Sequence, residues 1–89
     1  MALIYIVEDD ASIREIETIA LKNSNYMVQA FERASVFYEK MEELLPDLIL
    51  LDIMLPDEDG YRIVRRLRSN LKTKNIPVMM ITAKTPEMD

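Results

Sequence analysis

Acidic residues follow two short apolar runs of this 89-residue chain, in positions that suit metal and phosphoryl chemistry. Residues 3–7 lead into Glu8 and Asp9, and residues 48–51 lead into Asp52. If the two runs are neighbouring strands, about 4.8 Å apart, the three carboxylates lie close together and repel one another. A hard divalent cation such as Mg²⁺ relieves that repulsion, and a carboxylate beside it can attack a phosphoryl group to form an aspartyl phosphate.

Short runs of this apolar character predict strands that are buried on both faces, as in a parallel sheet. Amphipathic segments alternate with them, so the pattern predicts a doubly wound α/β fold with helices on both faces. Placing the first and third strands side by side results in the strand order 2-1-3-4, with the first helix alone on one face. The predicted strands cover residues 3–7, 26–31, 48–51 and 76–81, and the predicted helices cover residues 11–23, 35–45 and 61–70.

The helices are expected to pack on the sheet through apolar residues at helical spacing. One helix covers only about 10 Å of a sheet roughly 19 Å wide, so apolar side chains of the last two strands should lie bare beside the first helix. The fourth strand is also an unpaired edge, which predicts self-association through that edge and face. The expected inward residues are Ile13, Ile16, Ile19 and Ala20 in the first helix, Phe37, Met41, Leu44 and Leu45 in the second, and Ile63, Val64 and Leu67 in the third.

Composition argues against several classes of function. The chain has 11 basic and 16 acidic residues, and a net charge of −5 argues against contact with nucleic acid. It contains neither Cys nor His, which excludes disulfides, thiolate metal sites and imidazole catalysis within these residues. No apolar run approaches the roughly 20 residues that span a bilayer, and no signal peptide is evident, so a cytoplasmic location without membrane contact is expected. The arginines of the third helix are interpreted as a solvated face.

Three segments of the sequence resemble the receiver domain of bacterial two-component response regulators: IVEDDASIRE, LILLDIMLPDEDGYRIVRRLR and IPVMMITA. All 89 residues fit the resemblance, and the motifs fall in the family's order on the corresponding elements. The resemblance implies a flavodoxin-like fold and a signalling role rather than an enzyme. A histidine kinase would donate the phosphoryl group, and the resulting switch would control an output domain, often a DNA-binding one.

The resemblance also implies a role for each position that matches the family's site. Asp52 is the expected phosphoacceptor, and Mg²⁺ is the expected cofactor. The expected metal ligands are Asp9, Asp52 and the backbone carbonyl of Met54, with Glu8 acting through water, and the residues expected to contact the phosphoryl group and report its presence are Thr82 and Ala83.

The family has a fifth strand, followed by a Lys that pairs with the phosphoryl group, and this chain contains neither. Lys84 does not correspond to that Lys by position. Thr85, Pro86 and Glu87 are typical of a helix start, yet the chain stops at Asp89. Residues 1–89 are therefore expected to form a receiver domain that is C-terminally incomplete, without the fifth strand and the last two helices.

Two other functions are compatible with acids at strand ends. A Mg²⁺-dependent phosphatase of the haloacid-dehalogenase type also uses such an Asp, but it needs a second Asp two residues later, where this chain has Met54. A receiver-like interaction module that is not phosphorylated is the other alternative, because the Lys region is missing. Labelling by acetyl phosphate in the presence of Mg²⁺ separates these hypotheses.

Overall fold

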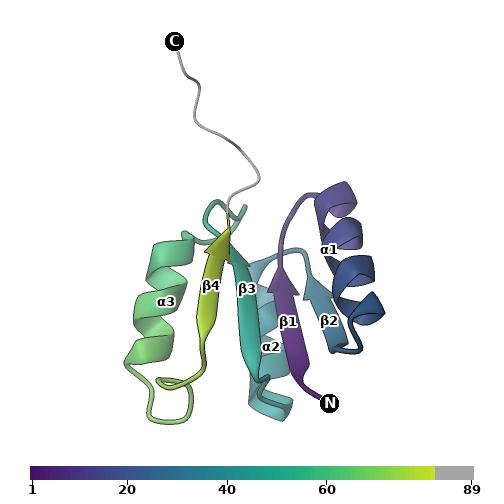
Figure 1. Cartoon of the computed structure of the whole chain (residues 1–89). Helices are drawn as coiled ribbons and strands as arrows, with labels where there is room; N and C mark the ends of the chain where they lie inside the picture. The colour runs from purple at the N-terminus through teal and green to yellow at the C-terminus, as the bar shows by residue number, and fades with distance from the viewer. Residues whose placement is uncertain (82–89) are drawn as a thin grey trace.

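The computed structural model describes residues 1–81, in which strands and helices alternate along the chain (Figure 1). The strands are β1 (Leu3–Val7), β2 (Met27–Phe31), β3 (Leu48–Asp52) and β4 (Val78–Ile81). The helices are α1 (Ala11–Asn23), α2 (Ala34–Glu43) and α3 (Gly60–Arg68). All neighbouring strands are parallel and the order is β2-β1-β3-β4, which confirms the predicted topology of a doubly wound, flavodoxin-like α/β sheet.

Several element boundaries differ from the prediction by one or two residues, for local reasons. Helix α2 stops at Glu43 instead of residue 45, because Leu44 is already extended, two residues before Pro46. Strand β4 begins at Val78, since Pro77 has no backbone N–H for the ladder. Helix α3 begins one residue early, at Gly60, and ends at Arg68. None of these differences moves an acidic residue away from its strand end.

A C-terminal capping motif ends α1 and connects it to β2. Asn25 has a φ of 71°, the left-handed conformation that Asn tolerates better than most residues. The N–H of Asn25 donates to the carbonyl of Lys22 at 3.0 Å, and that of Tyr26 donates to the carbonyl of Leu21 at 3.1 Å. These two bonds form a Schellman motif, which ends α1 and turns the chain into β2.

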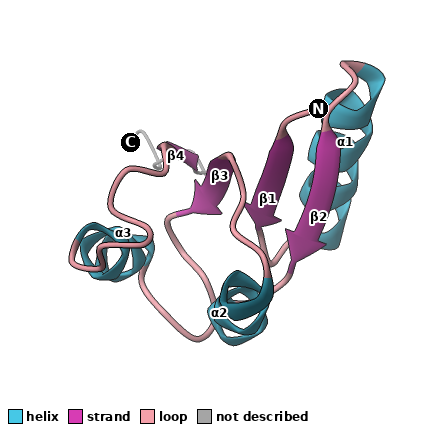
Figure 2. Cartoon of the chain, turned by 90° about the horizontal axis from the view of Figure 1, so that it is seen from below, coloured by secondary structure: helices cyan, strands magenta, loops and turns pink. Residues whose placement is uncertain are grey.

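Each face of the sheet has its own core, and Figure 2 shows α1 on one side and α2 with α3 on the other. The larger core lies on the side of α2 and α3, where the fully buried rings of Tyr5 and Phe37 meet edge to face at 6.4 Å. The smaller core holds Ile4, Ile6 and Leu50, with Leu21 of α1 packed against it. One helix on one face of the sheet and two on the other were predicted from the handedness of the crossovers, and this arrangement is confirmed.

Five of the expected inward side chains are exposed instead, and Ala20 of α1 is one of them. Ile16 and Ile19 of α1 are 67% and 53% exposed. Leu44 and Leu45 are exposed as well, because α2 has ended before they could continue its apolar face. On the side of α1, Met79 of β4 is 54% exposed, as expected, whereas Leu50 of β3 is buried against Ile4 and Ile6. The predicted shortage of helical cover is therefore confirmed at Met79 and wrong for Leu50. No helix within residues 1–81 is both long and apolar enough to cross a membrane.

Candidate functional site

The carboxylates singled out in the sequence meet at one edge of the sheet. Glu8 follows β1 directly and Asp52 is the last residue of β3, and these two strands pair in parallel, with Val7 opposite Leu51. Each of Glu8, Asp9 and Asp52 offers an oxygen atom, and these three atoms all lie within 4.8 Å of one another. Because parallel strands present their carboxyl ends at one edge, the fold brings Glu8 and Asp9 together with Asp52, which lies 44 and 43 residues further along the sequence.

Backbone contacts hold Glu8 in place. Its N–H donates to the carbonyl of Phe31 at 2.9 Å, so the residue continues the β1–β2 pairing by one position. Its carbonyl accepts a hydrogen bond of 2.8 Å from the Arg14 guanidinium, and its carboxylate accepts one of 3.1 Å from the N–H of Asp10. Only 3% of Glu8 is exposed, whereas Asp9 is exposed. The pair therefore presents one buried and one accessible carboxylate.

Asp10 has a structural role and does not join the cluster. Its carboxylate accepts a hydrogen bond of 3.0 Å from the N–H of Ile13 and so caps the N-terminus of α1. The omission of Asp10 from the predicted ligands agrees with this geometry.

Asp52 is 5% exposed, and its carboxylate accepts a hydrogen bond of 3.3 Å from the N–H of Met54. Met54 lies on the loop between β3 and α3, where its backbone pairs with that of Asp59 in an isolated antiparallel β-bridge. The loop thus turns back over the end of β3 and brings the backbone of Met54 beside the Asp52 carboxylate. Whether the carbonyl of Met54 serves as a ligand stays a prediction.

The single glycine of the chain permits this return of the loop. A Cβ atom on Gly60 would lie 2.8 Å from the carbonyl oxygen of Asp52 and 2.8 Å from the Cα of Ile53. The N–H of Gly60 donates to the carbonyl of Ile53 at 2.8 Å. The first turn of α3 therefore packs directly on the backbone of the phosphoacceptor candidate, at a distance that only glycine allows.

Burial and mutual repulsion disfavour negative charge at this edge. Burial, with a smaller contribution from the nearby Asp52 carboxylate, raises the pKa of Glu8 to about 7. Burial also raises the pKa of Asp52. The hydrogen bond from the N–H of Met54 opposes that rise but does not cancel it. Two buried carboxyl groups that resist ionisation next to an exposed third one form a site whose charge a cation would stabilise.

The three acids of the β3–α3 loop, Asp57, Glu58 and Asp59, each have a specific partner. Asp59 caps α3 by accepting a hydrogen bond of 2.7 Å from the N–H of Tyr61, as a helix start requires. Glu58 accepts a hydrogen bond of 3.2 Å from the hydroxyl of Tyr38 on α2. Asp57 accepts hydrogen bonds from two N–H groups in the first turn of α2. None of the three belongs to the carboxylate cluster.

The roles expected for Thr82 and Ala83 fall outside the described residues. Strand β4 places Ile81 opposite Asp52, and Ile81 is the last residue that the structure describes. Within residues 1–81, the structure brings Glu8, Asp9, Asp52 and the backbone of Met54 together.

Comparisons with known proteins identify the family and agree with the fold. The family model for the response regulator receiver domain matches residues 4–89. The transcriptional regulatory protein GltR of Pseudomonas aeruginosa is 36% identical over 86 residues, which cover 97% of this chain and 36% of that protein. The chain thus spans little more than a third of that relative's length.

Solved structures show the same architecture. The chemotaxis response regulator CheY4 of Vibrio cholerae superimposes with a TM-score of 0.88 at 27% identity, over 97% of this chain and 72% of that one. The Mn²⁺-bound form of response regulator Rcp1 has a TM-score of 0.86 at 25% identity, over 98% of this chain and 69% of that one. The family match, the shared sheet order and the acidic edge lead to one conclusion: the chain belongs to the family of response regulator receiver domains.

Proposed function

We propose that Asp52 accepts a phosphoryl group from a histidine kinase, and that the resulting change in charge at the sheet edge controls an output domain. The cluster of Glu8, Asp9 and Asp52, with oxygens within 4.8 Å of one another, is the observation that supports this proposal. An oxygen of the Asp52 carboxylate attacks phosphorus, the bond from phosphorus to the kinase's imidazole nitrogen breaks, and the nitrogen keeps the electron pair. The chain acts as acceptor and not as an enzyme.

Asp52 suits the role of nucleophile better than its neighbours. It ends β3, so its backbone is fixed by the sheet on one side and by the close approach of Gly60 on the other. The N–H of Met54 orients one of its oxygens. A nucleophile held in this way needs little rearrangement before attack. Asp9, by contrast, is exposed, and it is its backbone carbonyl that accepts a hydrogen bond, of 3.4 Å, from the Arg14 guanidinium.

Mg²⁺ fits the donor set of this edge. The proposed ligands are Asp9, Asp52 and the carbonyl of Met54, with Glu8 acting through a bound water, and oxygen donors of this kind are those that Mg²⁺ prefers. When bound, the ion would offset the negative charge of the carboxylates and of the transferring group. The Mn²⁺-bound form of Rcp1, a protein of the same fold, supports a divalent ion in this proposal.

The partners proposed for the whole protein are inferred from its relatives. GltR is a transcriptional regulatory protein of which the chain matches only a part. We therefore expect a DNA-binding output domain in the whole protein, and a cytoplasmic location where kinase and DNA are both accessible. The contact with nucleic acid would belong to that output domain and not to these acidic residues.

Labelling tests the phosphoacceptor. The chain is treated with acetyl phosphate and Mg²⁺, and mass spectrometry should locate the added phosphate on Asp52. The matched control is Asp57→Asn, which changes an acid on the same edge without touching the cluster and should be labelled like the wild type. If Asp52→Asn is labelled as well as the wild type, the assignment is wrong; a folded chain that takes no label would favour the unphosphorylated interaction module.

A metal titration tests the ligands. Asp9→Ala should weaken Mg²⁺ binding at least about tenfold, because an oxygen ligand and its charge are lost. Asp57→Ala should leave the affinity unchanged within about twofold. Equal losses in the two variants would place the ion elsewhere.

The edge of β4 supports a proposal about assembly. Within residues 1–81, β4 pairs only with β3, and Met79 on it is 54% exposed. Ile16 and Ile19 of α1 add exposed apolar area on the same face. We expect a second copy of the chain to pair with this edge and cover this face. Light scattering at micromolar concentration should detect the dimer, and a monomer that binds no hydrophobic dye would contradict it.

A further inference from the structure

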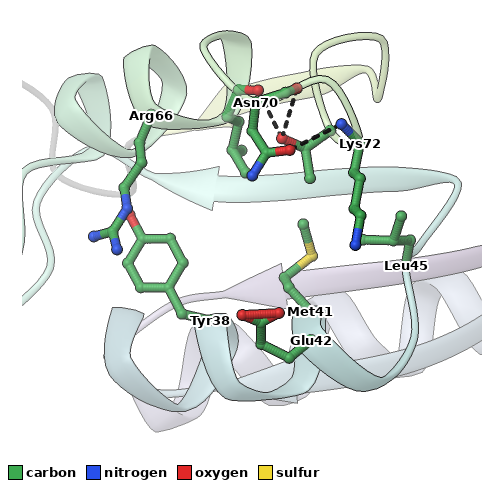
Figure 3. Close-up of a pocket in the computed structure, with 9 residues that line it drawn as sticks. Tyr38, Met41, Glu42, Leu45, Arg66, Asn70 and Lys72 are labelled. Atoms are coloured by element: carbon green, nitrogen blue, oxygen red, sulfur yellow. Dashed lines mark hydrogen bonds between the residues drawn. The ribbon is translucent and has the colours of Figure 1, made fainter.

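A pocket of about 150 Å³ lies between α2 and α3, away from the carboxylate cluster (Figure 3). Its apolar lining consists of Tyr38, Met41, Leu45 and Leu67. Cavities of about this volume hold a molecule the size of benzene. The pocket thus has room for one large apolar side chain.

The loop after α3 forms one wall of this pocket and is held rigidly. Thr73 is buried, and its hydroxyl donates a hydrogen bond of 2.6 Å to the carbonyl of Leu67. The carboxamide oxygen of Asn70 accepts one of 2.8 Å from the N–H of Lys72 (Figure 3). A wall fixed by these bonds exists before any ligand arrives, so binding does not have to order it.

The polar groups around the pocket are mainly donors. The guanidinium of Arg66 lies over the ring of Tyr38, with its central carbon 4.3 Å from the ring centroid. Within residues 1–81, neither Arg66 nor Lys72 forms an ion pair. Because the oxygen of Asn70 is already occupied, its NH₂ group is left to donate. Two cations and an amide donor around an apolar hollow suit carboxylates that flank an apolar group.

Charge is distributed unevenly along the chain, which favours the same kind of ligand. Residues 60–81 contain six of the 11 basic residues and no acidic residue, although the whole chain carries a net charge of −5. Helix α3 and the loop after it are therefore a positive region on an acidic domain. Such a region attracts a negatively charged partner.

We propose that the pocket between α2 and α3 binds an acidic segment of a partner protein, which inserts one large apolar side chain against Tyr38 and Leu67 and pairs its carboxylates with Arg66 and Lys72. Nucleic acid suits the pocket less well. A phosphate backbone would leave the apolar lining empty. The site is independent of phosphoryl transfer, because it shares no residue with the carboxylate cluster.

The test uses the metal-free chain and a fluorescein-labelled peptide of sequence Asp-Glu-Leu-Glu-Asp, whose binding is followed by fluorescence anisotropy. Arg66→Glu and Lys72→Glu should each weaken binding at least about tenfold, because a paired cation becomes a repelling anion. Arg65→Glu is the matched control, since it makes the same charge change one residue away on α3, outside the pocket. It should weaken binding by less than about threefold. Replacing the leucine of the peptide with alanine should cost at least about tenfold.

Circular dichroism checks that each variant is folded, and amide NMR shifts of Tyr38, Leu45 and Thr73 should move on binding in the wild type. Equal losses in the Arg65 and Arg66 variants would show that only the general positive charge matters, and would overturn the proposal. A peptide with alanine that binds as well as the one with leucine would overturn it too. The proposal would also be overturned by a duplex DNA oligonucleotide that displaces the peptide when the two ligands are compared at equal concentrations of negative charge. A dimer of the chain that Arg66→Glu dissociates would overturn it as well.

Discussion

The Asp57 carboxylate caps the start of α2, which lies 23 residues earlier in the chain: one of its oxygens accepts a hydrogen bond of 2.9 Å from the N–H of Ala34, the first residue of that helix. Its other oxygen accepts one of 3.0 Å from the N–H of Ser35. Arg33, the residue at the N-cap position, makes no such bond with its side chain. The loop that follows the phosphoacceptor candidate is thus tied to the start of α2.

Removing this cap should destabilise the fold without affecting the metal site. Although burial acts to raise it, the two amide donors hold the pKa of Asp57 below its ordinary value. Asp57→Ala should lower the free energy of unfolding by about 1 kcal/mol, the usual contribution of an N-cap. Urea denaturation measures the loss. Ser35→Ala is the control, since it removes only the hydroxyl, a smaller contribution to the Asp57 pKa, and keeps the backbone N–H that the cap needs. An equal loss in that variant would contradict the capping role.

Gly60→Ala should disturb the site and the fold together. The added methyl group would meet the backbone of Asp52 and Ile53 at 2.8 Å, and backbone atoms cannot move aside as a flexible side chain can. We expect a loss of about 1 to 3 kcal/mol of unfolding free energy and weaker Mg²⁺ binding, because the end of β3 must shift. Thermal denaturation and a metal titration measure the two effects. A variant as stable as the wild type would show that the loop is more adaptable than this close approach implies.

Without a divalent ion, the stability of the chain should fall as pH rises from about 4.5 to about 7. The pKa of Glu8 is raised to about 7, so the folded state keeps a proton in this range that the unfolded chain has already released. The expected loss is about 1 to 2 kcal/mol. The raised pKa of Asp52 acts in the same direction.

Urea denaturation in EDTA at about pH 5.5 and about pH 7.5 measures this pH dependence. Glu8→Gln should flatten it, because the carboxamide has no proton to lose. Mg²⁺ should restore stability at the higher pH in the wild type, since it compensates the charge that appears there. Stability that instead rises with pH in EDTA would contradict the burial argument.

Asn25→Gly should stabilise the chain. Asn25 occupies the left-handed position of the Schellman motif after α1, which glycine adopts without steric cost. We expect a gain of about 0.5 to 1 kcal/mol, partly offset by the greater freedom of glycine in the unfolded chain. Asn25→Val, which is β-branched, should be destabilising by at least that amount. Chemical denaturation compares the three proteins, and a stabilising valine would contradict the assigned turn.

Much of the architecture could be predicted from the sequence because its signals are local. The alternation of short apolar runs with amphipathic segments indicates parallel strands and crossover helices, and the handedness of crossovers then limits the sheet to one order. The same alternation places Glu8 and Asp52 at strand ends. Once β1 and β3 are neighbours, the geometry of a parallel sheet brings Glu8 and Asp52 close together.

The contacts that only the tertiary structure decided join segments far apart in the chain. Periodicity within α1 marks Ile16 and Ile19 as inward-facing, yet their exposure depends on how much of the sheet one helix can cover. Asp57 resembles a solvated acid in the sequence, and its bond to Ala34 exists because a loop and a helix start arrive at the same place. Likewise, the need for glycine at position 60 comes from the approach of the Asp52 backbone. Sequence patterns determine which elements form and where their ends lie, whereas packing between elements determines which polar groups meet and which apolar faces remain uncovered.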